Sequence, residues 1–185
     1  VKFIDGAVAN GVPKPVIEKF WKDLLGFADY CFNKSHSACY GLTSYHTAYL
    51  KAHYPSEFMA ALMTSDYDDT DRLTIEITEC KKMGIKVLQP DVNESFLEFA
   101  VVPQEEGKPG LIRFGMAAIK NVGTGAVEEI LRARDEQPFQ GLEDFFSRVS
   151  TRIVNRKALE SLIKAGAFDR FVTNGDPRSI LLHNL

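Results

Sequence analysis

Helical spacing of apolar residues is the feature that most limits what this chain can fold into. In residues 14–32 the apolar side chains recur on one wide face of a helix. Similar spacing returns over about 33–54, 56–64 and 72–83, and again after residue 115. Strand-like runs are short and confined to about 85–115. The pattern predicts a mainly α chain of the α+β class, with one small hairpin or three-stranded patch.

Composition narrows the class of protein. The 185 residues are 45% hydrophobic and 25% charged, an ordinary globular balance, and the formal net charge is -3. Acidic residues gather in 56–110, while both flanks are mildly basic, so an anionic partner is expected to meet the flanks. No apolar run is long enough to span a membrane. Three cysteines without a CxxC pair favour a reducing, cytoplasmic compartment. The chain starts at Val1 rather than methionine, which suggests a piece of a longer protein.

A glycine-rich turn stands between two helical segments, in the stretch KNVGTGAV. Gly123 and Gly125 permit positive φ and allow another backbone to come close. The amides of 123–126 would then open a helix, which makes an anion site, with Val122 and Ala126 as its apolar floor. The turn resembles the helix-hairpin-helix module, which binds duplex DNA through its phosphates without reading sequence. An ordinary tight turn is the alternative. The DNA-binding residues expected here are Lys120, Asn121, Val122, Gly123, Thr124 and Gly125, with Arg132 and Arg134 as flanking cations.

A second helix–turn–helix follows at about 142–166. Its turn, in RIVNRKAL, has no glycine, so its contact with phosphate is left open. The segment can equally serve only as the packing mate that stabilises the first unit.

The stretch FNKSHSACYGLTSYHTAYLKAHYP, from Phe32 to Pro55, combines a helical pattern with many polar and ring-bearing side chains. Lys34, Ser35 and His36 stand at the expected helix start, where a cation, a hydroxyl and free amides favour a phosphate. Tyr40, one turn further, can stack on a base or sugar. The opposite side of this helix is expected in the core; it carries Ala38, Leu42, Tyr45, Tyr49 and Leu50.

At this stretch the chain resembles the family C DNA polymerases, the bacterial replicative DNA polymerase III alpha subunits. The resemblance continues through LQPDVNESFLEF and IRFGMAAIKNVGTGAVEEILRAR to NRKALESLIKAGAFD, over roughly residues 3–172. It implies a helical fingers segment at 1–84, short strands and a hairpin at 85–114, a tandem helix-hairpin-helix at 115–170, and the start of another helical segment at 171–185. It also implies that Asn33, Lys34, Ser35, His36 and Tyr40 face the incoming deoxynucleoside triphosphate.

The resemblance further implies a non-catalytic part of a DNA-directed DNA polymerase. The palm carboxylates that hold magnesium would lie upstream of Val1, and the regions for the sliding clamp and other replicase subunits beyond Leu185. Primer-template duplex DNA and deoxynucleoside triphosphates are the expected partners, in the cytoplasm at the nucleoid. The acidic run DYDDTD at 66–71 is interpreted as a solvated loop, so no catalytic residue and no metal ligand is expected in this chain. A stand-alone helix-hairpin-helix DNA-binding module and a structural interaction module are the alternatives.

Overall fold

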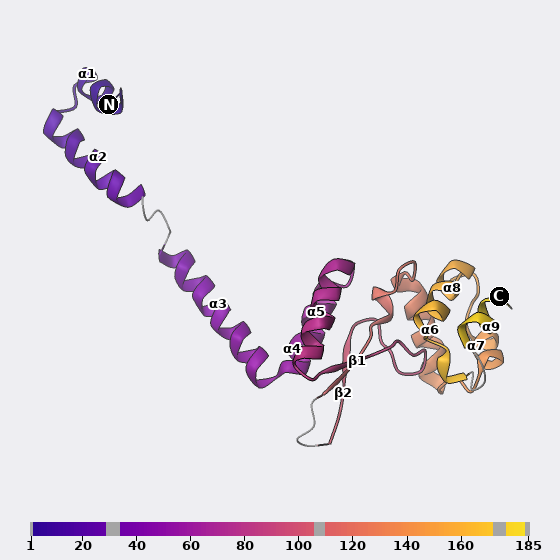
Figure 1. The fold of residues 1–185 in the computed structure, drawn as a ribbon. Helices are drawn as coiled ribbons and strands as arrows, with labels where there is room; N and C mark the ends of the chain where they lie inside the picture. Colours follow the sequence, from indigo (N-terminus) through magenta and orange to yellow (C-terminus); the bar gives the residue numbers. More distant parts are fainter. Residues whose placement is uncertain (1, 29–33, 106–109, 172–176, 184–185) are drawn as a thin grey trace. The chain divides into compact units, whose positions relative to one another are not determined.

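A computed structural model describes residues 2–28, 34–105, 110–171 and 177–183 (Figure 1). The chain divides into two compact units, residues 1–48 and 49–185. The described part is mainly helical with one small sheet, which confirms the predicted fold class.

The first unit holds two short helices that pack on each other. α1 (Lys2–Ala9), which the sequence pattern did not predict, lies on α2 (Lys14–Ala28). The ring of Phe3 stands 5.2 Å from that of Trp21 and 6.4 Å from that of Phe20. Pro15 sits in the first turn of α2, where its missing amide hydrogen costs nothing.

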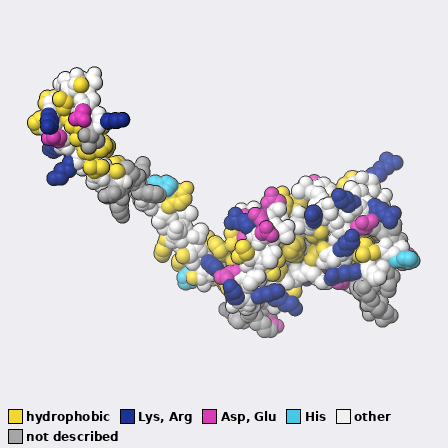
Figure 2. Space-filling view, turned by 45° about the horizontal axis from the view of Figure 1, so that its top comes forward, with side chains coloured by type: hydrophobic (Ala, Val, Ile, Leu, Met, Phe, Trp, Pro, Cys, Tyr) yellow, Lys and Arg dark blue, Asp and Glu magenta, His cyan; other side chains and the backbone are white. Residues whose placement is uncertain are grey.

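α3 (Lys34–His53) begins in the first unit and ends in the second, and none of its residues is buried. The expectation that one side of this helix lies in the core is therefore wrong. Leu42 is 57% exposed and Tyr45 64% exposed, and Ala38, Tyr49 and Leu50 are exposed as well. Hydrophobic side chains at the surface of this part of the chain are visible in Figure 2. Apolar spacing identifies the face a helix would bury, but burial requires a second element on that face.

The second unit opens with two helices against a small sheet. α4 (Pro55–Ser65) and α5 (Thr70–Lys82) pack on the strands β1 (Lys86–Leu88), β2 (Ala100–Val102) and β3 (Leu111–Arg113). The strand order is β1-β3-β2, with β1 parallel and β2 antiparallel to β3. Ile112 is paired with Val87 on one side and Val101 on the other. The small hairpin or three-stranded patch predicted within about 85–115 is thus confirmed as three strands, with β2 and β3 antiparallel and β1 beside β3.

The acidic run before α5 is more ordered than a solvated loop. Asp69 is the N-cap of α5, and its Oδ1 accepts from the amides of Asp71 and Arg72, both at 3.1 Å. The side chain of Asp66 is only 13% exposed and lies 2.9 Å from Nε of Arg72. The interpretation as a wholly solvated loop is therefore wrong for Asp66, because Arg72 in the first turn of α5 pairs with it.

The rest of the second unit is a helical bundle around its own core. Its elements are η1 (Met116–Ala118), α6 (Thr124–Glu136), α7 (Leu142–Arg148), α8 (Arg156–Ala165), η2 (Asp169–Phe171) and α9 (Pro177–His183). The segment entering the glycine turn is a single 3₁₀ turn rather than the predicted helix. Phe145 stands at the centre, with its ring 4.9 Å from the rings of both Phe139 and Phe168. This core fixes where the two turns before α6 and α8 lie.

Candidate nucleic-acid interface

The first turn differs from expectation in which residue takes the left-handed conformation. Gly123 is the N-cap of α6 with φ -77° and ψ 157°, an extended conformation, and Gly125 also lacks a positive φ. Asn121 has the positive φ instead, at 69°. Asparagine tolerates this region better than most residues because its short side chain can hydrogen-bond locally. Here its Nδ2 donates to Oγ of Ser161 on α8 at 3.3 Å. The positive φ that Gly123 and Gly125 permit is thus not used by either residue.

The start of α6 nevertheless has the features of an anion site. The amides of Ala126 and Val127 donate to the carbonyl of Gly123, at 3.0 and 3.2 Å. The amides of Thr124 and Gly125 find no acceptor in the described part of the chain. A Cβ added at Gly123 or Gly125 would meet nothing within 4 Å, so the turn faces open space. Val122 and Ala126 are buried beneath it, which confirms the predicted floor.

Of the three cations expected around this turn, two are already engaged within the protein. Arg132 forms a two-point ion pair with Glu129, Nε to Oε2 at 2.8 Å and NH2 to Oε1 at 3.0 Å. Arg134 donates to the carbonyls of Val92 and Ser95, at 3.0 and 2.8 Å. Lys120 is exposed and borders a hollow of about 540 Å³ between the turn and the loop at 67–70. Lys120 is therefore the better placed of the three to meet a phosphate.

The second turn reproduces this amide arrangement without glycine. Asn155 is the N-cap of α8; its Oδ1 accepts from the amide of Ala158 and its carbonyl accepts from Leu159, both at 3.0 Å. Among the described residues, no acceptor meets the amides of Arg156 and Lys157. The two turns thus each leave the first two helical amides available.

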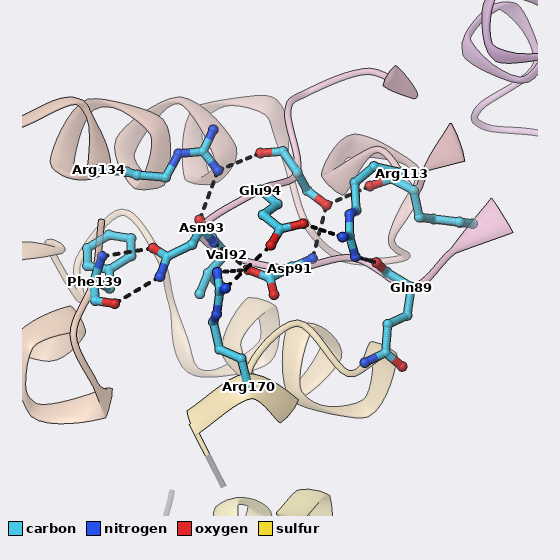
Figure 3. A network of polar contacts seen from close by, with 11 residues as sticks. Gln89, Asp91, Val92, Asn93, Glu94, Arg113, Arg134, Phe139 and Arg170 are labelled. Carbon is cyan, nitrogen blue, oxygen red and sulfur yellow. Dashed lines mark hydrogen bonds and ion pairs between the residues drawn. The ribbon is translucent and has the colours of Figure 1, made fainter. Parts of the chain in front are cut away.

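A polar network around residues 89–95 holds the bundle against the sheet (Figure 3). Asn93 and Phe139 exchange two hydrogen bonds, and Arg134 reaches the carbonyls of Val92 and Ser95 (Figure 3). The amide of Val92 donates to the carbonyl of Ala167 at 3.0 Å, and Oγ of Ser95 donates to that of Phe114 at 2.8 Å. The sequence analysis assigned no role to this segment.

Two arginines complete the network from the sheet and from the end of the bundle. Arg170 pairs with Asp91 at 2.9 Å and with Glu94 at 3.3 Å (Figure 3). Arg113 of β3 pairs with the same Glu94 and donates to the carbonyl of Gln89 at 2.9 Å. The sequence does contain acidic residues in QPDVNE and arginines later in the chain, which could have indicated ion pairs. Such a pattern does not say which charges pair with each other.

The residues expected to face a triphosphate lie on the first turns of α3. Lys34, Ser35, His36 and Tyr40 are all exposed there, and Asn33 lies outside the described residues. The rings of His36 and Tyr40 stand 4.2 Å apart. Further along the same side, Lys51 is ion-paired with Glu79 of α5 at 3.0 Å.

Neither a metal cluster nor a membrane span is found in the described residues. No group of three His, Cys, Asp or Glu side chains gathers there in a way that could hold a metal ion. Asp66 and Glu76 form an acidic pair, but Arg72 beside it disfavours a divalent cation. No helix among the described segments combines the length and apolarity that crossing a bilayer requires.

Two turns that pack on one shared core, and that each open a helix with its first two amides available, are the features of a helix-hairpin-helix. The family model described as helix-hairpin-helix motif matches residues 84–178. The chain is 46% identical to the DNA polymerase III subunit alpha of Campylobacter jejuni over 99% of its own length. It is 49% identical to that of Mycobacterium tuberculosis over 90%, and 47% identical to that of Thermus aquaticus over 92%. The chain therefore belongs to the helix-hairpin-helix family, and over nearly its whole length it corresponds to a segment of the DNA polymerase III alpha subunits.

The chain spans only 14 to 15% of the length of these relatives. The resemblance stated from the sequence motifs is confirmed, and it concerns one part of much longer proteins.

Proposed function

We propose that this chain serves as a non-catalytic segment of a bacterial replicative DNA polymerase and binds the backbone of duplex DNA through its hairpins. The observation that carries the proposal is the pair of free amides at Thr124 and Gly125, above which there is open space. Amides at a helix N-terminus favour a phosphate, and phosphate contacts read no sequence. Lys120 adds a positive charge beside them.

The proposal also gives α3 a role as the helix that contacts the incoming deoxynucleoside triphosphate. Its support is the exposed group of Lys34, Ser35, His36 and Tyr40 on adjacent turns. A lysine at a helix start suits a phosphate, and a tyrosine ring suits a base or sugar. Asn33, the remaining residue of the expected set, is included because the resemblance implies it.

The remaining parts of the polymerase reaction are assigned outside this chain. The carboxylates that hold magnesium, the contacts with the sliding clamp and the contacts with other replicase subunits would come from other regions of the full-length protein. Because the described acidic residues do not fit a metal site, no step of the reaction is assigned to residues of this segment. A purified 1–185 segment is expected to extend no primer. A cytoplasmic location at the nucleoid follows from the proposed role.

The test replaces Gly123 and Gly125 together by valine in the full-length protein. Since nothing lies within 4 Å of either Cβ position and neither residue needs a positive φ, the fold should persist while the approach of DNA is blocked. Duplex affinity is expected to fall equally on all sequences. The slope of log K against log salt should become flatter by about 0.9 for each phosphate that the turn no longer binds.

The matched control lies in the second turn. If Asn155→Ala and Arg156→Ala weaken duplex binding while the glycine double variant binds normally, the DNA contact belongs to the second hairpin and the assignment to Thr124 and Gly125 is wrong. Unchanged binding in all three variants would favour a structural or interaction module instead.

A further inference from the structure

Glu129 is a buried carboxylate in the middle of α6, with a side chain only 7% exposed. Oε1 accepts a hydrogen bond from the backbone amide of Ser150 at 2.9 Å, and both carboxylate oxygens accept from Arg132. These bonds, first that from Arg132 and then that from Ser150, lower the pKa of Glu129 to about 2. The group is therefore a charged acceptor at any pH near neutrality.

Ser150 is the first residue of the second turn. It follows the C-cap of α7, Val149, and its carbonyl accepts from the amides of Ile153 at 3.0 Å and Val154 at 2.9 Å. The chain then reaches Asn155, the N-cap of α8. By holding the amide of Ser150, Glu129 fixes the point at which this turn begins.

A second link joins the same two hairpins at their other end. Asn121, in the first turn, donates from Nδ2 to Oγ of Ser161 on α8. The first hairpin, made of the turn at 119–123 and α6, thus holds the second hairpin both before its turn, at Ser150, and after it, at Ser161. The free amides of α6 and those of α8 are held at a set separation by these two bonds and the shared core.

We infer that Glu129 is a positioning residue for duplex binding: it sets the second hairpin relative to the first so that both meet the same duplex. The inference rests on the proposed function of the hairpins. Glu129 itself would touch no DNA, since its carboxylate is turned to Ser150 and Arg132 and has a charge that phosphates repel.

Two substitutions of Glu129 in the full-length protein separate an effect on the position of the second hairpin from an effect of the lost negative charge. Both Glu129→Leu and Glu129→Gln remove a negative charge and release the exposed guanidinium of Arg132, so a charge effect alone would tighten duplex binding in both. Glutamine keeps an oxygen for the amide of Ser150, whereas leucine does not. If Glu129 acts by positioning the second hairpin, the two variants should therefore differ in duplex affinity. Glu129→Gln should bind duplex as tightly as wild type or more tightly, and Glu129→Leu should bind more weakly.

The salt dependence of duplex binding distinguishes a lost phosphate contact from a general loss of stability, which would leave the slope of log K against log salt unchanged. For Glu129→Leu the slope of log K against log salt should flatten by about 0.9 for each phosphate that the second hairpin no longer binds. Ser150→Pro removes the amide donor together with the serine hydroxyl and leaves the Glu129 carboxylate in place, and Val149 already has the extended conformation that precedes proline comfortably (ψ 129°). It should reproduce the flatter slope, and it serves as the test if the leucine variant fails to fold.

Three outcomes overturn the inference: tighter binding in Glu129→Leu, an unchanged slope in Ser150→Pro, or a loss in Glu129→Gln equal to that in Glu129→Leu. The Gly123→Val, Gly125→Val double variant, measured in parallel, distinguishes failure of the proposed duplex contact from failure of the positioning role of Glu129. If that variant also binds normally, the proposed duplex contact of the first hairpin fails. If it binds weakly while the Glu129 and Ser150 variants behave as wild type, only the positioning role fails.

Discussion

Asn93 and Phe139 exchange two hydrogen bonds of 2.8 Å, in which the side-chain amide of Asn93 donates to the carbonyl of Phe139 and accepts from its amide. This pairing joins the segment after β1 to the connection between α6 and α7. It gives an irregular stretch of backbone the pair of hydrogen bonds that a neighbouring strand would otherwise provide. The bundle and the sheet are thereby connected through a side chain rather than through a ladder.

Replacing Asn93 by alanine should lower the free energy of unfolding by about 1–3 kcal/mol, because both backbone groups of Phe139 lose their partner in a half-buried place. Asn93→Asp should also destabilise, since a carboxylate accepts from the amide of Phe139 but repels its carbonyl. Urea unfolding at neutral pH measures both. Wild-type stability in the alanine variant would show that water replaces the side chain at no cost.

Asn121 should tolerate glycine better than alanine. Glycine adopts a positive φ without penalty and loses only the bond to Ser161, whereas alanine in the left-handed region costs about 1–2 kcal/mol more. Thermal or urea unfolding of Asn121→Gly and Asn121→Ala compares the two directly. Equal stability would contradict the left-handed conformation of this residue.

The free energy of unfolding should depend on the protonation of Glu76. Burial, then a hydrogen bond and repulsion from Asp66, raise the pKa of Glu76 from its ordinary 4.5 to about 7, although Arg72 opposes this and Asp69 adds to it. Oε2 of Glu76 is buried and meets no hydrogen-bond donor among the described residues, and Oδ2 of Asp66 has only the cation Arg72 beside it, with Nε at 2.9 Å, so a proton on Glu76 supplies a donor between the two carboxyl groups. The stabilisation is fully present below pH 4.5 and is lost as the pH rises through about 7.

Glu76→Gln tests this linkage, because its amide donates to Asp66 at every pH. The wild-type free energy of unfolding should fall between about pH 5 and pH 8 by at most about 1.4 kcal/mol per pH unit from this group. The glutamine variant should show a flatter profile over the same range. An identical slope in both proteins would assign the dependence to other groups.

Lys34→Ala, His36→Ala and Tyr40→Ala in the full-length protein should each lower kcat/KM for nucleotide incorporation and leave affinity for primer-template nearly unchanged. A contact that strengthens in the transition state lowers kcat/KM when it is removed. For a charge-assisted hydrogen bond the loss is about 1.5–3 kcal/mol. Single-nucleotide incorporation kinetics provides the measurement.

Thr47→Ala is the matched control on the same helix, because the hydroxyl of Thr47 is already bonded to the carbonyl of Ser44 at 2.9 Å. It should behave as wild type. Wild-type kinetics in the three test variants as well would remove the triphosphate from α3 and leave the helix a structural role.

Local patterns predicted the helices well and their surroundings poorly. The apolar floor of Val122 and Ala126, the helices of the bundle and the three-stranded patch all followed from spacing within a few residues. The exposure of Leu42 and Tyr45 did not, because an amphipathic pattern does not contain the element that would cover it. Nor did the interpretation of residues 66–71 as a solvated loop reveal that Asp69 caps α5.

The sequence by itself determined the helical periodicities, the two turns and the family motifs, since each of these depends on residues close together along the chain. The tertiary structure alone decided which charges are free. Arg132 and Arg134 are the same residue type two positions apart, yet they face different sides of α6, one toward Glu129 and the other toward the carbonyls of Val92 and Ser95. Their partners come from the same helix in one case and from a segment some 40 residues earlier in the other. Only packing brings that distant segment within hydrogen-bonding distance, which is why the sequence alone could not single out Lys120 as the cation that we propose meets a phosphate.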